Sequence, residues 1–113
     1  MFKFRLLDSD NKVVGFEAES GGYWSYSGNN FAWNGIAINH SYKELSTNYH
    51  NKDGEEIFQN DIVKHFEEKY TVRYGEIELI TKEMVMYGFY LEQNGIPIRP
   101  FTETIAEDCE IRN

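Results

Sequence analysis

The sequence predicts an all-β protein, and three observations support this prediction. Aromatic residues make up 16% of the 113 positions, and Tyr, Phe and Trp favour strands. Turn-forming residues recur about every eight to twelve positions, a spacing typical of small barrels and sandwiches. The chain offers one short stretch with a helical pattern, residues 40–46, and we expect at most one turn of helix there.

The first forty-five residues predict two β-hairpins. Residues 2–7 alternate, with Phe2, Phe4 and Leu6 on one face, and the polar turn 8–11 leads into a second strand over residues 12–17. After Gly21 and Gly22, two aromatic runs at 23–26 and 31–34 flank a Gly-Asn loop. Ile36 and Ile38 suggest a further short strand.

The second hairpin carries a cluster of aromatic rings whose composition suits a contact surface, because Tyr and Trp bury a large area at low entropic cost. These rings are Tyr23, Trp24, Tyr26, Phe31 and Trp33. We expect them to fill the core between the hairpins and the rest of the protein, with an exposed interaction surface as the alternative.

Residues 51–64, NKDGEEIFQNDIVK, organise the remainder of the chain. Asp53 and Gly54 form a tight turn, because glycine accepts positive φ. Ile57 and Phe58 follow as an apolar plug for the core. The second turn ends at Asp61, and Ile62 and Val63 open a β-branched strand.

Downstream, the pattern predicts strands at residues 61–66, 70–80, 84–92, 96–101 and 105–111. We expect a turn at 81–83, a β-bulge at Gly75, and a type I′ turn at Asn94 and Gly95. Pro97 and Pro100 confine their strand to a sheet edge. Five strands over residues 56–111 indicate a small, partly open barrel resembling the Src-homology-3 fold, with the N-terminal hairpins packed on it. The regions 1–45 and 46–113 are expected to form one compact unit.

The segment that begins at Thr47 resembles the signature of the YopX family of bacteriophage and prophage proteins, a TG-x-x-DKNGKEIYEGDIVK-like pattern. The matching positions are Thr47, 51–54, 56–58 and 61–64, whereas Asn48 and the pair at 59–60 depart from it. Residues 46–113 fit the family's spacing, although the family's Gly-Asn-Ile-Tyr-Glu-Asn-Pro-like tail is missing. The family has no assigned biochemical function, so the resemblance implies a phage origin and a β fold, and no reaction.

The net charge of −8 is uneven along the chain. Residues 1–45 hold four Lys/Arg and five Asp/Glu, a net −1, and residues 46–113 hold seven and fourteen, a net −7. Such acidity repels phosphate and disfavours direct nucleic-acid binding. One cysteine, no long apolar run and an early acidic N-terminus predict a cytoplasmic protein without a membrane segment. The resemblance to the YopX family implies that this is the cytoplasm of a bacterial host cell.

The candidate chemical groups do not form a recognised catalytic or metal-binding pattern. His40, His50 and His65 are too far apart in sequence for a zinc ligand set, and we interpret them as surface or turn residues. Cys109 lies among acidic residues that would raise its thiol pKa, and we expect it to face the core. No catalytic residue, cofactor or metal is therefore predicted.

These observations favour a non-catalytic protein-binding module, with a host or phage protein as partner and homo-oligomerisation as a further route. The alternative is an acidic mimic of DNA or a nucleic-acid-associated accessory protein, and an enzyme comes third. For family-signature residues the expected role is structural; these are Asp53, Gly54, Ile57, Phe58, Asp61, Ile62 and Val63.

Overall fold

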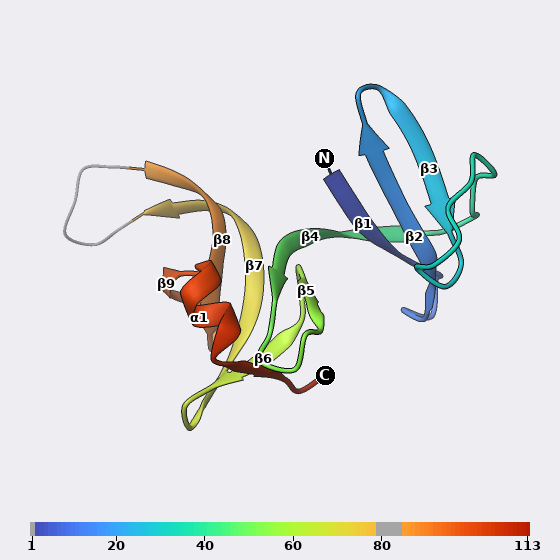
Figure 1. Ribbon diagram of the computed structural model, residues 1–113. Helices are drawn as coiled ribbons and strands as arrows, with labels where there is room; N and C mark the ends of the chain where they lie inside the picture. Colours follow the sequence, from blue (N-terminus) through green and yellow to red (C-terminus); the bar gives the residue numbers. More distant parts are fainter. Residues whose placement is uncertain (1, 79–84) are drawn as a thin grey trace. The chain divides into compact units, whose positions relative to one another are not determined.

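The computed structural model describes residues 2–78 and 85–113. It contains two five-stranded antiparallel sheets and one short helix, and no closed barrel forms among the described residues (Figure 1). The predicted all-β, partly open architecture with at most one short helix is therefore confirmed. The chain divides into two compact units, Met1–Ser46 and Thr47–Asn113. No helix in the described ranges is long and apolar enough to cross a membrane.

The N-terminal unit is built on a three-stranded meander. Its strands are β1 (Phe2–Leu7), β2 (Val13–Ser20) and β3 (Tyr23–Ser27), and β4 (Tyr42–His50) pairs with the other side of β1. The Asp8 carboxylate closes the first turn by accepting the backbone N–H groups of Asp10 at 2.8 Å and Lys12 at 3.0 Å. Asn11 supplies the positive φ, 62°, that the turn requires. The predicted first hairpin is confirmed.

Other predictions for this unit are wrong. Residues 42–46 belong to β4 rather than to a helix, because ladder pairing with β1 outweighs the weak propensity of a single helical turn. The segment 31–34 contributes one bridge, Tyr26 to Asn34, instead of a strand. Ile36 and Ile38 also lie outside any strand. The side chain of Asn29 explains part of this, since its Oδ1 accepts the N–H groups of Phe31 and Ala32 and holds a loop.

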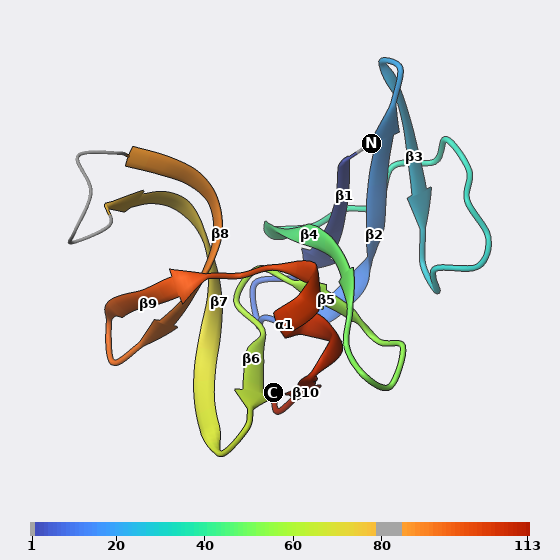
Figure 2. The same ribbon diagram turned by 60° about the vertical axis from the view of Figure 1, so that its left-hand side comes forward.

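The C-terminal unit contains the second sheet, with strand order β10-β6-β7-β8-β9. The strands of this sheet are β6 (Ile62–His65), β7 (Glu68–Glu78), β8 (Val85–Gln93), β9 (Ile96–Pro100) and β10 (Cys109–Ile111). The unit also contains β5 (Glu56–Phe58) and α1 (Glu103–Glu107), which lie outside this sheet. Figure 2 shows the chain crossing from β9 to α1 and β10. The turn between β8 and β9 has φ of 54° at Asn94 and 77° at Gly95, which fits the predicted type I′ hairpin. The predicted edge position of β9 is confirmed.

Three details of this unit differ from expectation. Residues 56–111 form six strands rather than five, and the expected last strand begins as helix α1, which Thr102 caps by accepting the Ile105 N–H at 3.3 Å. The expected bulge at Gly75 is absent: Gly75 faces Gly88 in an unbroken β7–β8 register. The register shift lies instead at Leu91/Glu92, opposite the proline-bearing edge strand. The predicted turn at 81–83 lies outside the described residues.

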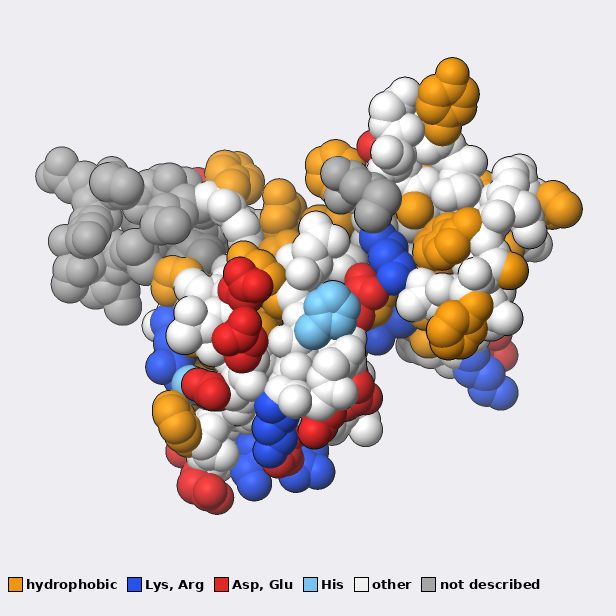
Figure 3. All heavy atoms as spheres, in the orientation of Figure 1, with side chains coloured by type: hydrophobic (Ala, Val, Ile, Leu, Met, Phe, Trp, Pro, Cys, Tyr) orange, Lys and Arg blue, Asp and Glu red, His pale blue; other side chains and the backbone are white. Residues whose placement is uncertain are grey.

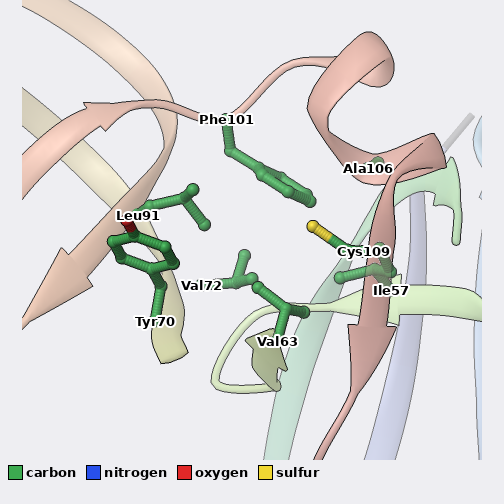
Figure 4. Close-up of a cluster of buried hydrophobic side chains, with 8 residues drawn as sticks. All are labelled: Ile57, Val63, Tyr70, Val72, Leu91, Phe101, Ala106 and Cys109. Atoms are coloured by element: carbon green, nitrogen blue, oxygen red, sulfur yellow. The ribbon is translucent and has the colours of Figure 1, made fainter. Parts of the chain in front are cut away.

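The core of the C-terminal unit lies between its strands and α1. Figure 4 shows the eight buried side chains that meet there: Ile57, Val63, Tyr70, Val72, Leu91, Phe101, Ala106 and Cys109. Ile57 and Phe58 are both buried, as predicted for the plug, although Phe58 lies outside this cluster. Cys109 faces the core, as predicted, whereas Ile62 is exposed at the start of its strand.

The turns within residues 51–61 are held by buried polar side chains. The Asn51 Oδ1 accepts the N–H groups of Asp53 at 3.0 Å and Glu55 at 2.8 Å, and Gly54 has a φ of 79°. Asn48 and Asn60, the residues at the signature's glycine positions, have φ of 62° and 73°. Asparagine thus adopts the left-handed conformation that glycine allows more readily.

Candidate protein-interaction surface

One face of the β1–β2–β3 meander carries four aromatic rings. Antiparallel register places Phe2 opposite Glu19, which is opposite Trp24, and Phe4 opposite Glu17, which is opposite Tyr26. Residues paired across a ladder share a face, so these six side chains project to the same side of the sheet. We call the four rings Phe2, Phe4, Trp24 and Tyr26 the aromatic face.

An ion pair lies among these rings. Glu17 is 4% exposed, and its Oε1 is 3.2 Å from the Lys43 Nζ. The Lys43 ammonium lies 4.4 Å from the Phe4 ring centroid and 5.6 Å from that of Trp24, within the range of cation–π attraction. A hydrogen bond to Glu17, with some desolvation, raises the pKa of Tyr26. The Glu17 carboxylate is therefore satisfied, and it fixes the surrounding rings.

An open hollow of about 470 Å³ lies at one end of the aromatic face. It is lined by Phe2, Phe4, Glu19, Gly22 and Trp24. The Glu19 Oε1 accepts the Gly22 backbone N–H at 2.7 Å, which anchors the carboxylate at the hairpin turn. Phe2 and Trp24 are 58% and 49% exposed, so their rings are accessible at the surface. Figure 3 shows several hydrophobic side chains at the surface of this unit.

The five aromatic residues singled out in the sequence do not form one surface. Strand alternation places Tyr23 on the opposite face from Trp24 and Tyr26. Trp33 lies with Lys3, whose Nζ is 5.8 Å from its ring centroid, and Phe31 is on the loop after β3. Tyr23, Trp24, Phe31 and Trp33 are all exposed, the first and third by 83% and 91%, so the expectation that these rings fill a core is wrong for four of the five.

The residues that complete the surface, Phe2, Phe4, Glu17, Glu19 and Lys43, were not predicted as members of a site. The sequence contained part of the signal, because Phe2 and Phe4 have the same two-residue spacing as Glu17 and Glu19. Their juxtaposition depends on the hairpin register, which shifts at Leu6/Leu7. Predicting Lys43 as part of this surface also required recognising residues 42–46 as a strand.

The C-terminal unit buries its potentially reactive groups. Burial, with a smaller contribution from Asp108, raises the pKa of the Cys109 thiol to about 11, and the thiol donates to the Ile105 carbonyl at 3.1 Å. His65 is buried, contrary to the expectation of a surface residue, with its Nδ1 3.2 Å from the Arg99 Nη2. Burial first, and Arg99 second, lowers the pKa of His65. This arrangement favours packing over nucleophilic chemistry.

The remaining histidines and carboxylates do not converge. His50 is exposed, and His40 bonds to the neighbouring Ile38 carbonyl at 2.8 Å through its Nδ1. Over residues 2–78 and 85–113, no group of three His, Cys, Asp or Glu side chains is arranged to hold a metal ion. The aromatic face is therefore the best-formed candidate site. No family model, curated protein or solved structure matches the chain.

Proposed function

We propose that the protein is a non-catalytic accessory protein, YopX-like and of phage or prophage origin, that works in the bacterial cytoplasm by binding another protein through its aromatic face. The observation that carries this proposal is the exposure of Phe2 and Trp24 beside a 470 Å³ hollow. Apolar rings gathered beside a hollow can mark a protein-interaction site.

The construction of the face suits binding. Its rings project from three hydrogen-bonded strands, so little conformational entropy is lost when a partner covers them. Tryptophan and tyrosine dominate the energetics of many interfaces. The ion pair between the buried Glu17 and the exposed Lys43 holds the Lys43 ammonium against the rings of Phe4 and Trp24 before the partner arrives.

The test is affinity capture from host lysate with the wild-type chain and two matched variants. Trp24→Ala removes a ring of the aromatic face, and Trp33→Ala removes a tryptophan from the opposite side of the sheet. We expect a specific partner to be recovered by the wild type and by Trp33→Ala, and lost with Trp24→Ala. Recovery that survives Trp24→Ala would contradict the proposal.

Two further measurements separate the remaining candidates. Light scattering of the purified chain and of Trp24→Ala shows whether the partner is a second copy of this chain. Competition by duplex DNA during capture tests the alternative of an acidic DNA mimic: a DNA-binding enzyme displaced by DNA would favour that alternative. A partner insensitive to DNA supports the binding module.

A further inference from the structure

We propose that the hollow formed by Phe2, Phe4, Trp24 and Glu19 binds a lysine or arginine side chain of the partner protein. This inference rests on the proposed function and specifies what that surface recognises. The hollow combines three aromatic rings with one anchored carboxylate, and none of its lining residues is basic. Ring faces and a carboxylate both attract a cation, and the rings also bury its alkyl stem.

The protein already binds one ammonium with two of these rings. The Lys43 Nζ lies 4.4 Å from the centroid of Phe4 and 5.6 Å from that of Trp24. The rings are thus oriented so that a cation can approach them. Phe2 and Glu19, the next cross-strand pair on the same face of the sheet, extend the same chemistry into the hollow.

The charge balance of this face favours a second cation. Lys43 is matched by the buried Glu17 at 3.2 Å, so this pair is neutral as a whole. In the described part of the chain, no lysine or arginine pairs with Glu19, whose Oε1 is held by a backbone N–H. One negative charge therefore remains beside exposed rings, where it favours a cationic side chain of the partner.

The first arm of the test is an amide-shift titration with N-acetyl-lysine methylamide and N-acetyl-arginine methylamide. The matched probe without charge is N-acetyl-norleucine methylamide. We expect saturable shifts at Phe2, Phe4 and Trp24 with both cationic probes, and at least tenfold weaker binding of the norleucine probe. Equal binding of norleucine, shifts confined to another surface, or no saturable shift would overturn the inference.

Variants identify the groups responsible. Glu19→Gln keeps a side chain that can accept the Gly22 N–H but removes the charge, and we expect about tenfold weaker binding of the lysine probe. Trp24→Ala should abolish probe binding, and Trp33→Ala should leave it unchanged. An unchanged affinity in Glu19→Gln would remove the carboxylate from the proposal and overturn it.

The same variants distinguish failure of this inference from failure of the proposed function. If the captured partner is lost with Trp24→Ala but retained in full by Glu19→Gln, the protein-binding role stands and cation recognition is wrong. If the partner survives Trp24→Ala, the aromatic face is not the binding surface. Loss of the partner with both variants, but not with Trp33→Ala, supports both proposals.

Discussion

The buried carboxylate of Asp61 joins two segments of the C-terminal unit. Its Oδ2 accepts the Phe58 backbone N–H at 2.8 Å, and its Oδ1 accepts the Asn113 side-chain Nδ2 at 2.7 Å. Asn113 in turn accepts the Ile62 N–H at 2.7 Å through its Oδ1. The turn at residues 58–61 is thus closed by one of its own residues and by Asn113, which is 52 positions away.

We therefore expect Asp61→Ala to lower the free energy of unfolding by about 1–3 kcal/mol, because the buried Phe58 N–H loses its acceptor. Asn113→Ala should cost about 1 kcal/mol, since it removes hydrogen bonds at a more exposed position. Urea unfolding followed by far-UV circular dichroism measures both. The exposed Asp53→Ala is the control, and an Asp61→Ala midpoint equal to that of Asp53→Ala would contradict the role of Asp61.

Phe58 allows a direct test of the plug. Phe58→Ala should lower the free energy of unfolding by about 3–5 kcal/mol, because the buried ring leaves a cavity. Phe66→Ala is the matched control: its ring is 75% exposed in the turn between β6 and β7. If the two phenylalanine variants unfold at the same urea concentration, the plug contributes no more than a surface ring.

His65 makes the stability of the C-terminal unit depend on pH. Burial and the neighbouring Arg99 lower its pKa below the ordinary value of 6.5, despite the opposing Asp108 carboxylate. As pH falls through 6.5, the unfolded chain binds a proton that the folded chain still excludes, so stability is lost on acidification. In the His65→Gln variant, the free energy of unfolding should therefore fall less between about pH 7.5 and about pH 5 than in the wild type.

The control for that experiment is His50→Gln, which alters an exposed histidine in β4. Both variants retain the carboxylates of the wild type, whose titration contributes equally to all three curves. The difference between wild type and His65→Gln therefore isolates one group. A wild-type curve that parallels His65→Gln across the whole window would show that the histidine is not buried in its neutral form.

The parts of the fold that were predictable are those fixed by local chemistry. Asp8, Gly54 and Asn94 mark turns by their own conformational preferences, and the structure places a turn at each. Helix α1 was missed because a five-residue helix has almost no periodic pattern, and its cap at Thr102 was its main local signal. The Leu6/Leu7 register shift is equally invisible in the sequence.

The candidate site was only partly predictable for the same reason. Trp24 and Tyr26 could be selected by composition, because exposed aromatic residues beside glycine suggest contact surfaces. Their neighbours Phe4 and Lys43 come from strands that meet them only through long-range pairing. Side-chain faces follow from register, and register is a property of the assembled sheet.

Gly15 tests how closely the N-terminal sheet is packed. A Cβ at this position would lie 2.7 Å from the Ser27 carbonyl oxygen and 2.6 Å from the Ile38 Cδ1. Gly15→Ala should therefore lower the free energy of unfolding of this unit by about 1–3 kcal/mol through overpacking. Both tryptophans, Trp24 and Trp33, lie in Met1–Ser46, so tryptophan fluorescence during urea unfolding reports on this unit.

Gly28→Ala is the matched control, because the same added methyl group would meet nothing within 4 Å at that position. The double variant Gly15→Ala/Ile38→Ala separates the two contacts. Ile38 can move away, whereas the Ser27 carbonyl is part of the β3 backbone and cannot move without disturbing the sheet. We expect the double variant to remain destabilised; recovery to the level of Ile38→Ala alone would show that the side-chain contact, and not the strand spacing, requires glycine here.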